Sequence, residues 1–266
     1  MKTVGVFDSG VGGLSVLRAL LAELPGVRFV YVADSAYSPY GERTVAKITE
    51  RSERITGWLR HTHHIDALVV ACNTATAMAI DRLRVTHPDL PIVGVEPALK
   101  PAAAASRTRH IGVLATRGTL NSERFARLRT QLEHTASTPV HFICQPCDGL
   151  ADAIERDDVL TQQALCERYV TALRDNAPGD MDTVVLGCTH YPFAADVLAQ
   201  LLGSDVALVD TGEAVARRTR DVLNMSGPKG TNATPPVLLS TGDPAALSLA
   251  AQRWLDLPTR AAKLMV

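Results

Sequence analysis

Two cysteines stand in the same local context, and that context suits acid–base chemistry. The segments ALVVACNTAT (residues 67–76) and TVVLGCTHYP (residues 183–192) each join an apolar, strand-like run to a small residue, a cysteine and two polar residues. Cys72 and Cys188 therefore both lie where a predicted strand gives way to a helix. In α/β proteins this carboxyl edge of the sheet is where ligands bind.

Two thiols on opposite sides of one bound molecule suit the inversion of a stereocentre. One thiolate removes a proton from one face of a carbon atom, and the opposing thiol delivers a proton to the other face. A helix N-terminus directly after each cysteine would favour the thiolate. The alternative is that both are core thiols at equivalent strand ends, because cysteine is among the most buried residue types. Two cysteines with His190 make an incomplete zinc set, so no metal is expected.

Polar residues beside the two cysteines fit a ligand site. Asn73 and Thr74 supply side-chain donors at the expected start of a helix, where backbone N–H groups suit a carboxylate. Thr189 is their counterpart after Cys188. His190 either shares the proton of Cys188 or only hydrogen-bonds a carbonyl group.

The first predicted strand ends in DSGVGGLS, which begins at Asp8. This segment lacks the spacing of a dinucleotide-binding loop, because Ser15 occupies the third glycine position. We interpret it as a tight turn that directs Asp8 and Ser9 towards the ligand. Asp8 either poises Cys72 or caps the helix that follows.

Two further segments are candidates for a site. The segment SAYSPYGERT (residues 35–44) either closes over a small ligand or is an ordinary Pro/Gly turn. Cys144 and Cys147 form a CQPC pair that resembles half of a zinc or redox motif. The second pair that such a zinc site needs is absent, so we expect neither metal binding nor redox chemistry there.

Short apolar runs alternate with helical patterns along the chain. The predicted strands lie near residues 4–7, 29–32, 68–71, 92–95, 111–114, 140–143, 184–186, 207–209 and 237–239. The clearest helical periodicities cover residues 14–24, 45–62, 122–132, 160–173, 193–202 and 245–254. This alternation predicts mostly parallel sheets with helices on both faces, and nine strands are many for one sheet.

A weak internal repeat indicates two α/β domains. VGVFDSGVGGL near the start resembles IGVLATRGTL from residue 111, and the two cysteine segments follow in the same order. We therefore predict two similar doubly wound, flavodoxin-like domains related by a pseudo-twofold axis, with the active site in the cleft between them. A breaker at 96–101, an alanine-rich connector at 102–105 and a surface loop at 226–236 suggest the boundaries. The first domain is predicted at 1–97 plus 208–266, and the second at 98–207.

Composition excludes several classes of protein. The 266 residues carry a formal net charge of −1 without a basic block, which disfavours binding to nucleic acid or an anionic membrane. No apolar run approaches the roughly 18 residues of a membrane-spanning helix. The odd number of cysteines, five, and the absence of a signal-peptide pattern lead us to expect a reduced, cytoplasmic protein.

The segments FDSGVGGLSV, SPYGERT, ACNTATA, GVLATRGT and LGCTHYP together resemble the glutamate racemase family. They follow that family's order and spacing from residue 4 to about residue 193. The resemblance implies a cofactor-independent enzyme of two α/β domains that interconverts L- and D-glutamate for cell-wall peptidoglycan. It also implies an active site between the domains and a homodimer.

The resemblance also implies roles for individual residues. Cys72 and Cys188 match the two catalytic bases, the first acting on D-glutamate and the second on L-glutamate, with Asp8 and His190 assisting them. The positions that match substrate-binding residues are Asp8, Ser9, Tyr40, Gly41, Asn73, Thr74, Thr116, Thr119, Thr189 and His190.

One segment departs from the family pattern. Family members carry a proline after a cysteine and a glutamate eight residues beyond that cysteine. Here Asp148 takes the proline position after Cys147, and Glu155 keeps the glutamate spacing. An alignment on Cys144 selects Asp152 as the assisting acid instead, so the choice stays open.

The absence of a cofactor fits the lysine positions. A pyridoxal enzyme needs a lysine for a Schiff base, and none of the five lysines stands at a strand end beside the two thiols. Three alternatives remain: an aspartate racemase with the same two thiols, a hydrolase with a Cys188–His190 dyad, and an amino-acid-binding protein. A hydrolase leaves Cys72 without a role, and a binding protein needs no paired thiols.

Overall fold

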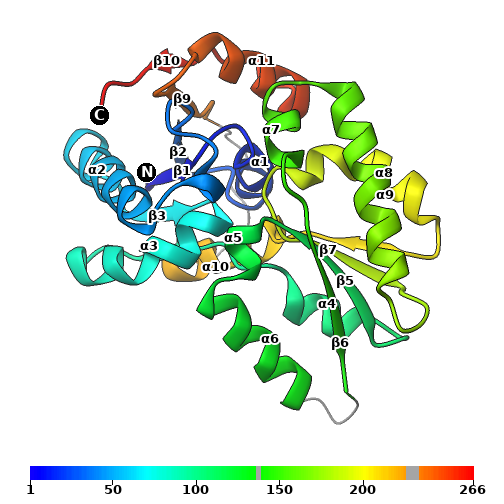
Figure 1. The fold of residues 1–266 in the computed structure, drawn as a ribbon. Helices are drawn as coiled ribbons and strands as arrows, with labels where there is room; N and C mark the ends of the chain where they lie inside the picture. Colours follow the sequence, from blue (N-terminus) through cyan, green and yellow to red (C-terminus); the bar gives the residue numbers. More distant parts are fainter. Residues whose placement is uncertain (136–138, 226–233) are drawn as a thin grey trace. The chain divides into compact units, whose positions relative to one another are not determined.

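The computed structural model of the protein describes residues 1–135, 139–225 and 234–266. Its chain forms two compact units (Figure 1). The first comprises Met1–Val95 and Gly212–Val266, and the second comprises Glu96–Thr211. The predicted return to the first domain at residue 208 differs from this division, because the strand at 207–209 pairs within the second unit.

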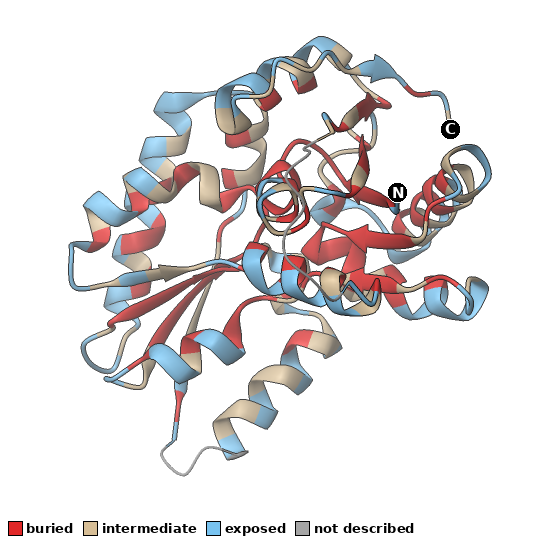
Figure 2. Cartoon of the chain, turned by 180° about the vertical axis from the view of Figure 1, so that it is seen from behind, coloured by how far each residue is buried: buried red, intermediate tan, exposed pale blue. Residues whose placement is uncertain are grey.

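The first unit contains a six-stranded parallel sheet in the order β10-β9-β2-β1-β3-β4. Its strands are β1 (Thr3–Asp8), β2 (Arg28–Ala33), β3 (Ala67–Val70), β4 (Ile92–Gly94), β9 (Val237–Ser240) and β10 (Ala262–Lys263). Its helices are α1 (Leu14–Glu23), η1 (Tyr40–Glu42), α2 (Val45–His63), α3 (Asn73–Thr86), α10 (Gly212–Val222) and α11 (Pro244–Leu255). The central strands are buried while the helices expose their outer faces (Figure 2), which explains why these strands read as continuous apolar runs.

The second unit contains a four-stranded parallel sheet in the order β6-β5-β7-β8. Its strands are β5 (His110–Ala115), β6 (His141–Pro146), β7 (Thr183–Leu186) and β8 (Ala207–Val209). Its helices are α4 (Leu99–Ala105), α5 (Arg117–Leu120), α6 (Glu123–Thr135), α7 (Leu150–Glu155), α8 (Val159–Asp175), η2 (Tyr191–Ala194) and α9 (Ala195–Leu202).

The two sheets share one strand order. The order β2-β1-β3-β4 in the first unit corresponds to β6-β5-β7-β8 in the second. Strands β1 and β5 carry the first pair of sequence repeats, and β3 and β7 carry the cysteine pair. The predicted α/β class with parallel sheets is therefore confirmed. In such sheets the strand order reverses between the first and third strands, and ligands bind at the carboxyl ends there.

Some local predictions differ from the structure. The alanine-rich connector belongs to helix α4, because Pro101 lies in its first turn, where the missing N–H removes no helical hydrogen bond. Strand β10 was not predicted, because two residues carry no periodicity. Of the predicted surface loop at 226–236, residues 226–233 lie outside the described residues. Across the described ranges, every helix is too short or too polar to cross a membrane.

Candidate active site

Cys72 lies at the junction of β3 and α3. It is the N-cap residue of α3, and its Sγ accepts a hydrogen bond of 3.4 Å from the Ala75 N–H. The helix that the sequence predicts there thus begins directly after the cysteine. The first N–H groups of a helix and its dipole stabilise negative charge, so a thiolate at Cys72 is favoured by its position.

Ser9 connects Cys72 with a buried carboxylate. The Cys72 thiol donates to Ser9 Oγ over 3.9 Å, and Ser9 Oγ donates to Asp8 Oδ1 over 2.9 Å. Asp8 is fully buried, and the N-cap residue of α1 is Gly13. A Cβ at Gly13 would lie 2.7 Å from the Asp8 Cβ, so only glycine lets this turn approach the carboxylate. We call Asp8, Ser9 and Cys72 the Cys72 half-site.

Asn73 and Thr74 follow Cys72 in the first turn of α3 and are 6% and 4% exposed. The Oδ1 atom of Asn73 is buried without a hydrogen-bond partner in the described part of the chain. Leaving such a group unpaired costs about 1–3 kcal/mol. A ligand that donates a hydrogen bond to this oxygen, such as an ammonium group, would remove that cost.

Tyr40 and Gly41 lie in η1, which packs against α3. Tyr40 is buried in the same hydrophobic cluster as Cys72, and its hydroxyl donates to Asp34 Oδ2 over 2.6 Å. Burial and the charge of Asp34 raise the pKa of Tyr40 well above its usual value. The hydroxyl of Tyr40 therefore stays protonated, and it donates its hydrogen bond to Asp34 within the protein.

Cys188 lies beyond the end of β7, in a position equivalent to that of Cys72. Its Sγ lies 3.7 Å from His190 Nδ1, and His190 Nε2 lies 2.7 Å from Glu155 Oε2. Cys188 and His190 are both buried. Burial alone would lower the pKa of His190, but the hydrogen bonds to Cys188 and Glu155 raise it well above its usual value. We call Glu155, Cys188 and His190 the Cys188 half-site.

The chain after Cys188 differs from the prediction. It forms the 3-10 turn η2, and helix α9 begins only at Ala195. The expectation of a helix N-terminus directly after Cys188 was therefore wrong. Short 3-10 turns are frequent at the N-termini of α-helices, and η2 leads directly into α9. Thr189 is buried beside Cys188.

The structure brings Glu155, rather than Asp152, to His190. Glu155 is the last residue of α7 and contacts the imidazole. Asp152 forms an ion pair with Arg156. Asp148, which takes the family's proline position, forms an ion pair with Arg117.

Thr116 directly follows β5, and Thr119 lies in α5. Thr116 caps α5 by accepting from the Thr119 N–H over 3.2 Å, and the two hydroxyl oxygens are 2.9 Å apart. In the repeat, Thr116 corresponds to Ser9 and Ala115 to Asp8. The second unit thus has no carboxylate at that strand end, and Glu155 supplies one from α7 instead.

The Cys144 and Cys147 thiols donate to backbone carbonyl groups, those of Phe142 and Gln145. Burial raises the pKa of both thiols, so both are neutral hydrogen-bond donors at neutral pH. Within the described ranges, no three His, Cys, Asp or Glu side chains are grouped to hold a metal ion.

Comparison with known proteins places this geometry in a family. The family described as Asp/Glu/Hydantoin racemase matches residues 4–219. The glutamate racemase of Pseudomonas aeruginosa PAO1 is 51% identical over 223 residues, covering 83% of this chain and 81% of the relative. That of Ralstonia pickettii is 46% identical over 241 residues, covering 90% and 83%.

Solved structures agree. The Escherichia coli glutamate racemase in complex with L-glutamate and the activator UDP-MurNAc-ala is 34% identical, with a TM-score of 0.85 and coverage of 100% of this chain and 98% of that one. The glutamate racemase isoform RacE1 from Bacillus anthracis is 28% identical, with the same TM-score and coverage.

The chain belongs to the Asp/Glu/Hydantoin racemase family. It is an amino-acid racemase, an isomerase, and the resemblance to glutamate racemases seen in the sequence is confirmed.

Proposed function

We propose that this enzyme interconverts L- and D-glutamate by two-base proton transfer between Cys72 and Cys188. One observation carries the proposal. The two cysteines follow equivalent strands, β3 and β7, of two sheets with the same order, and each has its own hydrogen-bonded chain to a carboxylate. Duplicated units that each supply one base suit a reaction that is the same in both directions.

In this mechanism one thiol acts on each face of the substrate's α-carbon. The Cys188 thiolate removes the α-proton of L-glutamate, and the C–H electron pair stays on carbon as a carbanion. The Cys72 thiol then donates its proton to the opposite face, which yields D-glutamate and leaves the thiolate at Cys72. D-glutamate reacts by the reverse path.

The α-proton of an amino acid is very weakly acidic, so the site must stabilise the carbanion. The N-terminus of α3 suits a substrate carboxylate, and the unpaired Oδ1 of Asn73 suits the substrate ammonium group. Asn73, Thr74 and Thr189 lie beside the two cysteines and supply further polar groups. Preorganised donors in a site without water are the expected source of stabilisation where no cofactor acts.

Glutamate as the substrate is supported by relatives named glutamate racemase, whose sequences are 51% and 46% identical to this one. We further propose that the enzyme is a cytoplasmic homodimer, that it needs no cofactor, and that its D-glutamate serves peptidoglycan synthesis. Aspartate is the second candidate substrate, because the family that matches residues 4–219 is described as Asp/Glu/Hydantoin racemase.

Incubation with L-glutamate in deuterium oxide, without added cofactor, tests the function. We expect optical rotation to fall to zero while deuterium replaces the α-proton. Polarimetry measures the first change and NMR measures the second. L-aspartate under the same conditions should keep most of its rotation. Folded, reduced protein that leaves glutamate unchanged but racemises aspartate would transfer the assignment to aspartate.

A further inference from the structure

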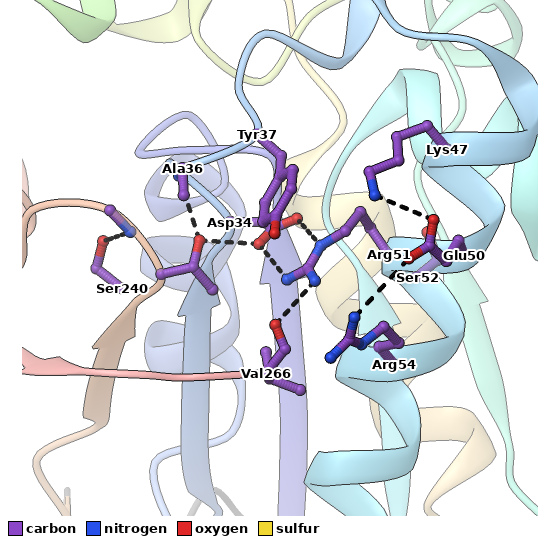
Figure 3. A network of polar contacts seen from close by, with 12 residues as sticks. Asp34, Ala36, Tyr37, Lys47, Glu50, Arg51, Ser52, Arg54, Ser240 and Val266 are labelled. Carbon is purple, nitrogen blue, oxygen red and sulfur yellow. Dashed lines mark hydrogen bonds and ion pairs between the residues drawn. The ribbon is translucent and has the colours of Figure 1, made fainter.

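A buried ion pair lies behind the η1 segment. Asp34 directly follows β2, and Arg51 lies in α2; both side chains are fully buried. Arg51 Nε and Nη2 donate to the two oxygens of Asp34 over 3.0 and 2.9 Å (Figure 3). Arg51 Nη1 donates to the carbonyl group of Val266 over 2.8 Å. Buried charges of this kind persist only when paired and hydrogen-bonded.

The carboxylate of Asp34 receives two more donors. The Tyr40 hydroxyl donates to Oδ2 over 2.6 Å, and the Thr241 hydroxyl donates to Oδ1 over 2.8 Å. With the two bonds from Arg51, each oxygen therefore accepts two hydrogen bonds. A fully satisfied buried network of this kind rigidifies the segments that it joins.

The same network holds the segment 35–41 at several points. The Ala36 N–H donates to Thr241 Oγ1 over 3.2 Å, and the Arg51 guanidinium lies 4.0 Å from the centre of the Tyr37 ring (Figure 3). The Tyr37 N–H donates to the carbonyl group of Asp34 over 2.9 Å. Near the end of the segment, the Tyr40 hydroxyl donates to Asp34.

Asp34 also contacts the Cys72 half-site through the backbone. Its N–H donates to the carbonyl group of Asp8 over 2.9 Å. Tyr40 packs in the same cluster as Cys72. Asp34 therefore joins two parts of the first unit: its N–H binds the strand end that carries Asp8, and its carboxylate binds Tyr40.

We propose that Asp34 and Arg51 are positioning residues for racemisation, and that their ion pair holds segment 35–41 against α3 in its substrate-binding conformation. They act through Tyr40 and Gly41 rather than by contact with the substrate. We name the Asp34–Arg51 pair, together with Tyr40 and Thr241, the clamp. Because of the clamp, segment 35–41 loses its conformational entropy when the protein folds rather than when the substrate binds. The link to racemisation rests on the proposed function, whereas the clamp itself does not.

Two variants test the clamp at different strengths. Tyr40→Phe removes one donor to Asp34 and keeps the ring. Arg51→Lys keeps the charge but loses the two-pronged pairing and the stacking on Tyr37. Arg60→Lys is the matched control, because Arg60 lies on the same helix and pairs with Asp89 through two nitrogens at the surface.

The first readout is amide hydrogen exchange of residues 35–43 by mass spectrometry, which needs no activity. We expect exchange about tenfold faster in Tyr40→Phe and Arg51→Lys, and unchanged exchange in Arg60→Lys. The second readout is the kinetics of racemisation. We expect the KM for glutamate to rise about tenfold, because the cost of ordering segment 35–41 then falls partly on binding, while kcat changes less than threefold.

The outcomes are distinct. Unchanged exchange in segment 35–43 in both variants would overturn the clamp, as would faster exchange with an unchanged KM. A fall in melting temperature with a proportional loss of all activity would show a purely structural pair and contradict the positioning role. If the unmodified enzyme failed to racemise glutamate, the proposed function would fall, while the exchange measurement would still decide whether the clamp exists.

Discussion

The two half-sites share their position in the fold and differ in the groups that support the thiol. In the Cys72 half-site a hydroxyl, Ser9, lies between the thiol and the carboxylate of Asp8. In the Cys188 half-site an imidazole, His190, lies between the thiol and the carboxylate of Glu155. A hydroxyl passes on a hydrogen bond, whereas an imidazole also holds a proton near neutral pH.

The backbone that follows the cysteine also differs between the two half-sites. Helix α3 begins directly after Cys72 and donates an N–H to its sulfur, whereas a 3-10 turn follows Cys188. The first thiol thus relies on helix N–H groups and the second on a protonated imidazole. Equivalent positions in the two units therefore carry the same side chain, a thiol, among different neighbouring groups.

Loss of either thiol should have the largest effect. Cys72→Ser and Cys188→Ser should each lower racemisation at least about 10³-fold, because a hydroxyl is a far weaker acid than a thiol. Cys144→Ser, at a half-buried cysteine outside both half-sites, is the control and should stay within twofold. Polarimetry with L-glutamate measures all three. Full turnover in either active-site variant would refute the two-base mechanism, and loss in Cys188→Ser alone would favour a hydrolase-like dyad.

Loss of the carboxylate behind His190 should have the next largest effect. Glu155→Gln should slow racemisation roughly 10²-fold, because the imidazolium loses its negative partner. Asp152→Asn, one turn earlier on α7, should stay within twofold. Equal losses in both variants would show that α7 matters only as a helix.

Isotope effects would show which face each half-site serves. Because enantiomers have equal free energies, kcat/KM must stay equal for L- and D-glutamate in every variant. A difference between the two half-sites can therefore be seen in the isotope effects but not in kcat/KM. In Glu155→Gln the Cys188 step limits the rate, and the primary isotope effect should rise with α-deuterated L-glutamate and fall with the D-enantiomer. Asp8→Asn should reverse this pattern. The same change for both enantiomers in either variant would contradict the assignment of faces.

The stability of the protein should depend on pH through His190. Its pKa is raised on folding, so its stabilising contribution is complete below the unfolded pKa of about 6.5 and is lost as pH rises through the folded pKa. The excess free energy of unfolding over His190→Gln should therefore shrink as pH rises above about 6.5. Urea denaturation at several pH values measures this difference. An excess that grew with pH would mean that His190 is buried neutral.

The smallest effect is expected at the turn behind Asp8. Gly13→Ala places a Cβ 2.7 Å from the Asp8 Cβ and 2.9 Å from the Tyr31 hydroxyl oxygen, which should destabilise the protein by about 1–3 kcal/mol. Gly26→Ala is the control, since a Cβ there has no neighbour within 4 Å. Thermal unfolding compares the two, and equal melting temperatures would show that the turn yields easily.

Much of this arrangement was predictable from the sequence. The repeated strand–Cys–polar pattern predicted two equivalent thiols and two parallel sheets, because strands buried on both faces read as apolar runs. The choice between Glu155 and Asp152 required the structure, because both lie on the short helix α7 and only its packing decides which carboxylate reaches His190.

The clamp was outside the reach of sequence patterns. Arg51 lies in a helix rich in charged residues, where an arginine normally faces solvent. Its charge is paired by Asp34 on another element, and its Nη1 donates to Val266, which lies 215 residues further along the chain. The periodicity at residues 193–202 did indicate α9, but the 3-10 turn that separates this helix from Cys188 carries no pattern of its own.

The most direct test of the two-base mechanism is the isotopic content of the first product. L-glutamate would be incubated in deuterium oxide to about 5% conversion, and both enantiomers separated and analysed by mass spectrometry. Two opposed thiols predict D-glutamate that carries deuterium at the α-carbon, beside remaining L-glutamate that is still largely protiated. D-glutamate that retained much of the original proton would contradict the mechanism, because one base would then be serving both faces.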